Sequence, residues 1–249
     1  MRTRRQCRGF SLTEVLLAVG TLAVGMLFIG GTFLVGVHFT TVATEQSIAA
    51  VAADEAFAKI RLYGINPDPR ATVDPNWSLG LLVPFNEVAL RPVDPNEFAY
   101  PSSNINNSEK QYHWSALCRR LEPIDPNSRL VEVTVFICRK AGSGAVYPRG
   151  HRWPVPMRVS VSGAIGENTL TITEPGKVTW VGDGFTIIDG ETGQRYRVLR
   201  RGRYEPPEVI VLDRAWMGPS EPNGVWVVPP AIEGNRNPCI AVYQRVMRL

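Results

Sequence analysis

The feature that most constrains this chain is an uncharged apolar run near its N-terminus. Residues 15–37 contain no acidic, basic or histidine side chain. An apolar stretch of about 20 residues is long enough to cross the hydrocarbon core of a membrane as a helix. The run is preceded by four arginines, Arg2, Arg4, Arg5 and Arg8. Because basic residues keep their end of a span in the cytoplasm, the sequence predicts a single span at about 15–37, with the following residues on the far side.

A single acidic residue, Glu14, stands directly before this run. A charge within a membrane costs about 2.5–3.5 kcal/mol on insertion scales, so this carboxylate is expected to have a partner. Glu14 is the fifth residue counted from Phe10, and the pair Gly9-Phe10 follows the arginines. Cleavage after Gly9 would place the new amine of Phe10 about one helical turn from Glu14.

The basic leader, the Gly9-Phe10 junction and Glu14 ahead of an apolar helix resemble a prepilin-type cleavage and methylation motif. The layout resembles the N-terminus of type IV pilins and type II secretion pseudopilins, over roughly residues 1–62. The resemblance implies a minor pilin or pseudopilin, cleaved between Gly9 and Phe10 by a prepilin peptidase and N-methylated on Phe10. In that family Glu14 would pair with the Phe10 amine of a neighbouring subunit during assembly.

The same resemblance implies partners and a location. The partners would be other pilin or pseudopilin subunits, an inner-membrane assembly platform and the lipid bilayer. The chain would be a single-pass protein of the inner membrane with a cytoplasmic N-terminus. Its head would be periplasmic, or extracellular after assembly into a type II secretion pseudopilus or a type IV pilus.

Two other interpretations of the N-terminus were weighed. An ordinary secretory signal peptide has an apolar region of about 7–15 residues that ends near a small-residue cleavage site. Here the run is longer, and the nearest Ala-x-Ala, at 50–52, lies well beyond it. The other interpretation is a signal-anchor helix that holds a periplasmic enzyme or ligand-binding module. It leaves Gly9-Phe10 and Glu14 without a role.

Small residues recur along the predicted span. Thr21, Gly25, Thr32 and Gly36 fall within about 60° of one another on a helical wheel. Such a face lets a second helix approach closely, so these four residues are candidates for helix packing. Glycine is also frequent in membrane helices generally, which is the alternative explanation.

The helix is expected to continue past the membrane, over 10–63 in all. Residues 40–62 contain no Gly or Pro and are rich in strong helix formers. Gly64 and Pro67 are predicted to end the helix. The apolar stripe offered to the head is expected to consist of Val51, Phe57, Ile60 and Leu62.

The rest of the chain predicts β structure, so the expected fold class is α+β, a long N-terminal membrane helix followed by a β-rich globular head of one or two small subdomains. The 20 prolines and 22 glycines of the whole chain suit short strands and turns. The clearest strand is 130–138, where Val131, Val133 and Val135 alternate with Glu132 and Thr134.

The head is predicted to have two parts, 64–168 and 169–249. Strands of the first part, which is expected to pack against the helix, are predicted at 79–83, 112–118, 130–138 and 155–161, with an irregular loop over 84–107. The second part is expected to be a small barrel or sandwich. Its strands are predicted at 169–173, 185–189, 194–200, 209–212, 225–228 and 240–246.

Nothing in the sequence supports catalysis, a metal site, a cofactor or a nucleic-acid surface. The formal charge is +4, but loss of the four leader arginines leaves 23 basic and 23 acidic residues. The three histidines, His38, His113 and His151, lack metal-ligand spacing. Asp183, Asp189 and Glu191 could converge on a cation, although turns favour Asp for their own reasons.

The cysteines leave a question open. Cys7 would be lost with the leader, and Cys118, Cys138 and Cys239 would remain. The far side of the membrane permits disulfides, so one bridge and one thiol are possible. Cys118 and Cys138 are not expected to be directly opposite in their hairpin, and disulfide geometry is strict.

Overall fold

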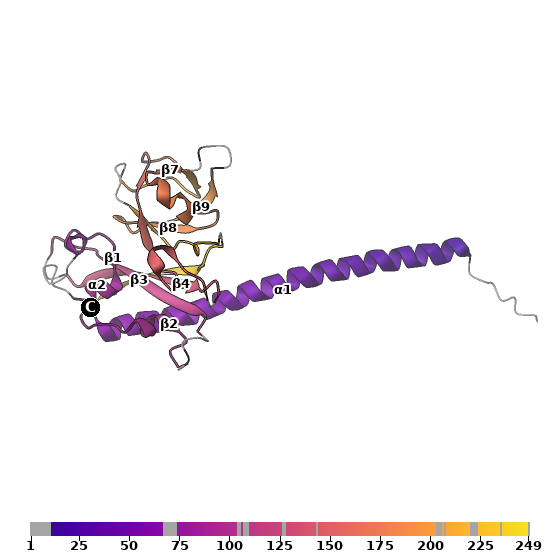
Figure 1. The fold of residues 1–249 in the computed structure, drawn as a ribbon, viewed down its shortest axis with the longest axis horizontal. Helices are drawn as coiled ribbons and strands as arrows, with labels where there is room; N and C mark the ends of the chain where they lie inside the picture. The colour runs from indigo at the N-terminus through magenta and orange to yellow at the C-terminus, as the bar shows by residue number, and fades with distance from the viewer. Residues whose placement is uncertain are drawn as a thin grey trace, which may run out of the picture. The chain divides into compact units, whose positions relative to one another are not determined.

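The computed structural model describes residues 11–66, 74–103, 106, 110–125, 128–142, 144–202, 206, 208–219, 224–234 and 236–248. The chain divides into two units, one that ends at Ser47 and one that begins at Ile48. Helix α1 runs without a break from Leu12 to Tyr63 (Figure 1). A helix of 52 residues is about 80 Å long. The predicted long N-terminal helix is confirmed over these residues.

The helix ends where its sequence predicts. Gly64 adopts a φ of +72°, the left-handed conformation that stops a helix and that glycine adopts without strain. Its N–H donates to the carbonyl of Ile60 at 2.9 Å, which closes the last turn.

The first sheet of the head has five antiparallel strands. They are β1 (Val83–Pro84), β2 (Ala99–Tyr100), β3 (Tyr112–Arg120), β4 (Leu130–Arg139) and β12 (Cys239–Arg248). The order is β1-β3-β4-β12, and β2 also pairs with β3. The β3–β4 hairpin, predicted at 112–118 and 130–138, is confirmed.

One face of this sheet packs on the C-terminal part of α1. Along β4, Val131, Val133, Val135 and Ile137 contribute to this core. The helix contributes Ala49, Ala52, Ala53, Ala56, Phe57 and Ile60. The stripe predicted from sequence was half wrong, because Val51 and Leu62 are 59% and 74% exposed. The alanines, spaced three and four apart, lie on the packed face, where their small side chains let the helix approach the sheet closely.

Short elements complete this region. They are η1 (Pro75–Trp77), α2 (Phe85–Val88) and η2 (Pro95–Phe98). The segment predicted as an irregular loop over 84–107 therefore contains α2, η2 and β2 among its described residues. Phe85 and Val88 of α2 are buried in the helix-facing core, which explains why this stretch is ordered.

The second sheet has seven antiparallel strands and is nearly barrel-shaped. The order is β5-β11-β8-β9-β10-β7-β6. The bounds are β5 (Met157–Val159), β6 (Val161–Ser162), β7 (Thr169–Ile172), β8 (Thr186–Asp189), β9 (Arg195–Arg201), β10 (Val209–Leu212) and β11 (Val225–Val227), with η3 (Pro148–Gly150) and η4 (Pro175–Trp180) beside them. The first and last strands, β5 and β6, are separated only by Ser160. The two edges of the sheet therefore come together, and the sheet curls around its own core.

Two strands belong to a different sheet from the one predicted. The segment predicted at 155–161 forms β5 and β6 of the second sheet, whereas it was expected beside the helix. The segment predicted at 240–246 forms β12, which pairs with β4 in the first sheet. The chain therefore leaves the first sheet after β4 and returns to it only at β12. The seven-stranded sheet is an insertion between two neighbouring strands.

Candidate functional site

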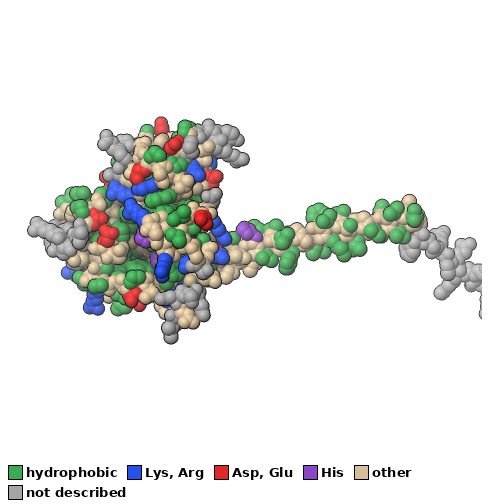
Figure 2. All heavy atoms as spheres, in the orientation of Figure 1, with side chains coloured by type: hydrophobic (Ala, Val, Ile, Leu, Met, Phe, Trp, Pro, Cys, Tyr) green, Lys and Arg blue, Asp and Glu red, His purple; other side chains and the backbone are tan. Residues whose placement is uncertain are grey.

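The N-terminal part of α1 presents apolar side chains on all of its faces. Leu16, Leu27, Phe28 and Leu34 are between 65% and 76% exposed. Figure 2 shows hydrophobic side chains along this part of the helix. By length and composition this helix is able to cross a membrane, a property it shares with N-terminal signal sequences. An apolar surface of this extent is unfavourable in water, which makes this part of the helix a candidate site for contact with lipid or with other helices.

Glu14 lies in the first turn of α1, where its side chain is exposed. The Ser11 hydroxyl accepts a hydrogen bond from the Thr13 N–H at 3.3 Å, so Ser11 caps the helix. Ser11-x-x-Glu14 is also the sequence of a capping box, in which the Glu side chain returns to the N-cap residue. Sequence reasoning missed the capping position of Ser11 and the matching spacing of Glu14. A negative charge in the first turn also interacts favourably with the helix dipole.

The four small residues on the predicted packing face lie in the exposed N-terminal unit. The hydroxyl of Thr21 donates to the carbonyl of Ala18 at 3.0 Å, and that of Thr32 to the carbonyl of Phe28 at 3.0 Å. A Cβ built at Gly25 or Gly36 meets no atom within 4 Å. Both hydroxyls are thus satisfied within the helix, so this face carries no unsatisfied hydroxyl. Its role in helix packing stays a prediction.

The predicted processing site, Gly9 and Phe10, lies outside the described residues. Cleavage and methylation there also stay predictions.

A second candidate site is the joint between the two sheets of the head. Its apolar part consists of Leu82, Leu117, Phe136, Cys138, Ile188 and Val228. Leu117, Phe136 and Cys138 lie on the face of the first sheet that points away from α1, and the other three side chains pack against them. Because both of its faces are covered, β3 is buried almost throughout, and Thr134 on β4 is fully buried.

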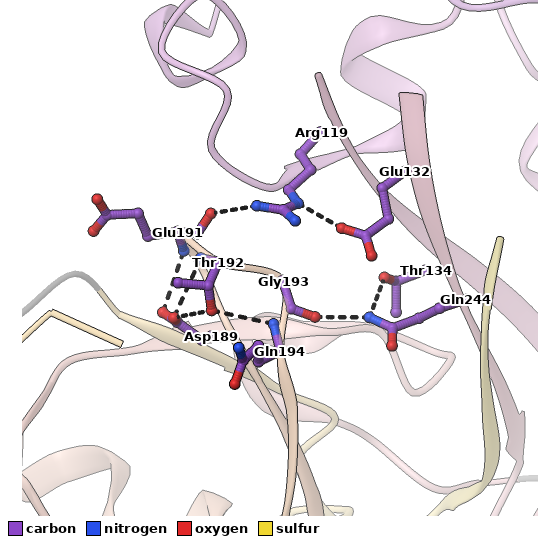
Figure 3. Close-up of polar contacts among 9 residues, drawn as sticks. All are labelled: Arg119, Glu132, Thr134, Asp189, Glu191, Thr192, Gly193, Gln194 and Gln244. Atoms are coloured by element: carbon purple, nitrogen blue, oxygen red, sulfur yellow. Dashed lines mark hydrogen bonds and ion pairs between the residues drawn. The ribbon is translucent and has the colours of Figure 1, made fainter. Parts of the chain in front are cut away.

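The polar part of the joint is a set of hydrogen bonds from the first sheet to the turn between β8 and β9 (Figure 3). Arg119 forms an ion pair with Glu132 and donates from Nη1 to the carbonyl of Glu191 at 2.8 Å. Gln244 of β12 donates from Nε2 to the carbonyl of Gly193 at 2.7 Å and to the Thr134 hydroxyl at 3.1 Å. Two strands of the first sheet, β3 and β12, thus hydrogen-bond to one turn of the second, and β4 holds both of these side chains through Glu132 and Thr134.

Asp189 organises that turn. Its carboxylate is buried and accepts hydrogen bonds from the N–H groups of Glu191 and Thr192 at 3.2 Å and from the Thr192 hydroxyl. Gly193 completes the turn with a φ of +70°, and a Cβ there would lie 2.6 Å from Glu132 Oε2. The turn therefore favours glycine for its backbone conformation, and a side chain there would displace the Arg119–Glu132 pair.

The acidic residues weighed as a cation site have other partners. Asp183 accepts a hydrogen bond from the Arg201 N–H at 2.8 Å, and Asp189 serves its own turn. Within the described ranges, no group of three His, Cys, Asp or Glu side chains is placed to hold a metal ion.

His113 is a buried titratable side chain of the head with a strongly shifted pKa. It is buried on β3, and its ring stacks on Trp153 with the centroids 5.2 Å apart. Burial lowers its pKa to about 3. The imidazole is therefore neutral at physiological pH, and its Nδ1 has no hydrogen-bond partner among the described residues.

Together these features define a class of protein: a long apolar N-terminal helix whose C-terminal part joins the core of a β-rich head. In comparisons with known proteins, no family model, no curated protein and no solved structure matches this chain.

Proposed function

We propose that this chain is a pilin-like structural subunit, a minor pilin or pseudopilin of a type II secretion pseudopilus or a type IV pilus. One observation carries the proposal: a single uninterrupted helix is exposed and apolar at its N-terminal end and buried in the head at its C-terminal end. The first segment is suited to a membrane and then to packing against other helices. The second joins the hydrophobic core of the head.

The residues before the helix support the same proposal. The basic leader, Gly9-Phe10 and Glu14 have the spacing that a prepilin peptidase and pilin assembly require in the family. Prepilin peptidase, fellow subunits and an inner-membrane assembly platform are the proposed partners, and the role is structural rather than catalytic. The head would be periplasmic, or extracellular once the subunit is assembled.

The direct test is the N-terminus of the protein taken from membranes of cells that contain a prepilin peptidase. Mass spectrometry should find Phe10 as the first residue, carrying an N-methyl group. Gly9→Leu should abolish cleavage, because a bulky residue precedes the junction, and Gly9→Ala should retain part of it. An intact Met1 terminus in these cells would refute the pilin assignment.

Assembly should depend on the charge of Glu14. In a filament, the ammonium of Phe10 in a neighbouring subunit would lose its counter-charge if Glu14 were neutral, and breaking a buried pair costs about 3–5 kcal/mol. Glu14→Gln should therefore reduce disulfide crosslinking between cysteines engineered into adjacent N-terminal helices, while membrane insertion persists. Gln also serves in a capping box, so this variant separates pairing from helix capping. Crosslinking at the native level in Glu14→Gln would remove the pairing role.

A further inference from the structure

Two cysteines face each other at the point where the chain leaves the first sheet and returns to it. Cys138 lies near the end of β4, Cys239 begins β12, and the two are direct partners in the antiparallel register. The N–H of Arg139 donates to the carbonyl of Pro238 at 2.8 Å. That bond flanks the cysteine pair, whereas the N–H of Cys239 donates to Asn237 Oδ1 at 2.9 Å. Cys138 and Cys239 therefore have the hydrogen-bond pattern of a non-hydrogen-bonded pair on this side, and the register shifts at the irregularity between Cys239 and Ala241.

This position suits a disulfide. In non-hydrogen-bonded pairs the Cα atoms are about 4.5 Å apart and the side chains are at their closest. Disulfides need a Cα separation of about 4.4–6.8 Å. The Cys239 thiol donates to the carbonyl of Ala241 at 3.6 Å, and it is close enough to the Cys138 thiol to raise the pKa of that group. Both side chains lie at the apolar part of the joint between the sheets.

Cys118 is placed differently. Its register partner on β4 is Val133, and its side chain is buried in the core beneath the helix, on the other face of the sheet. The sheet itself separates Cys118 from Cys138, so the bridge left open by the sequence cannot join these two without rebuilding β3 and β4.

We propose that Cys138 and Cys239 are a disulfide-forming pair and that Cys118 remains a thiol. Formation of the bond in the cell rests on the proposed function, which places the head on the oxidising side of the membrane. The pairing itself rests on the strand register alone.

The reaction needs a disulfide as oxidant, such as that of a protein thiol–disulfide oxidase or of oxidised glutathione. Cys239 is partly exposed, so its thiolate attacks the oxidant first and forms a mixed disulfide, releasing one oxidant thiolate. The Cys138 sulfur then attacks the Cys239 sulfur and expels the second oxidant thiolate. Two thiol protons leave the protein, and the oxidant gains two electrons.

The disulfide would link the two points at which the inserted seven-stranded sheet connects to the first sheet. All residues between Cys138 and Cys239, including strands β5 to β11, would lie within one covalent ring. Burial and the neighbouring Cys239 raise the pKa of the Cys138 thiol, which slows the second step in the folded protein. A ring of about 100 residues strongly restricts the unfolded chain. Its closure should raise the melting temperature of the head by about 10–15 °C.

The test uses the full chain, purified in detergent and equilibrated with oxidised glutathione. After unfolding without reductant, alkylation should modify Cys118, and Cys7 where the leader is retained, but neither Cys138 nor Cys239. Tryptic digestion should yield one linked peptide pair, lighter by two hydrogen atoms than the reduced pair. Dithiothreitol should lower the melting temperature of this sample.

Variants make the result specific. Cys239→Ser should free Cys138 for alkylation and remove the effect of dithiothreitol on melting, and Cys118→Ala should change neither. Alkylation of Cys138 and Cys239 after glutathione treatment, or a linked peptide that contains Cys118, would overturn the proposal. The disulfide could form with glutathione in the purified protein and yet be reduced in protein taken directly from cells. That result would support the Cys138–Cys239 pairing but would contradict an oxidising location of the head, and so the proposed function.

Discussion

The C-terminal part of α1 is part of the hydrophobic core of the head. Fragments that begin before and after this part of the helix should therefore differ in stability. A fragment that begins at Ile48 keeps the helical residues of the core, whereas one that begins at Gly64, after the helix, loses them all. Burying Phe57 and Ile60 stabilises the fold by about 1.5–3 kcal/mol each, and the four buried alanines contribute about 0.8 kcal/mol each. The loss of about 6–9 kcal/mol is comparable to the whole stability of a typical domain, about 5–15 kcal/mol.

The assay is urea unfolding followed by circular dichroism and tryptophan fluorescence. Residues 48–249 should be soluble and rich in β structure and should unfold cooperatively. Residues 64–249 should aggregate or show no cooperative transition, because the apolar face of β3 and β4 is left uncovered.

Point variants in the longer fragment give a matched comparison. Phe57→Ala, at a side chain 2% exposed, should cost about 3–5 kcal/mol. Leu62→Ala, five residues further along the same helix and 74% exposed, should change stability by no more than about 0.5 kcal/mol. If residues 64–249 unfold cooperatively with a stability within about 1 kcal/mol of the longer fragment, the helix is not part of the core of the head and the argument fails.

Two further predictions concern the interior of the head. Gly193→Ala should destabilise residues 48–249 by about 1–3 kcal/mol more than Gly184→Ala in urea unfolding, because both residues have a positive φ but only a Cβ at Gly193 meets Glu132 and Arg119; equal losses would show that the contact is unimportant. The free energy of unfolding should also fall by about 1.4 kcal/mol per pH unit as the pH drops from about 6.5 to about 3, the folded pKa of His113. In this window the unfolded chain binds a proton on His113 and the buried imidazole does not. His113→Phe should flatten that part of the pH profile measured by urea titration, and an unchanged slope would assign the pH dependence to other groups.

The sequence by itself determined the local elements of this protein. A long uncharged run, an alanine-rich continuation and Gly64 were sufficient for a helix that ends at Tyr63, because helix length and termination are local properties. Alternating Val131, Val133 and Val135 were sufficient for β4, since a side-chain period of two is visible along the chain. The candidate assembly residue, Glu14, was equally visible, as a lone charge beside apolar neighbours.

The tertiary structure alone decided which elements meet. Beside its hairpin partner β3, β4 pairs with β12, about a hundred residues later, and no local pattern encodes a pairing across a seven-stranded insertion. Cys138 and Cys239 are separated by a similar length of chain, and Gln244 reaches the turn at Gly193 from 51 residues away. On α1, buried alanines could not be told from exposed ones by composition, because alanine favours a helix in either environment. Burial was decided by the sheet that packs against the helix, and that sheet exists only when the two ends of the head come together.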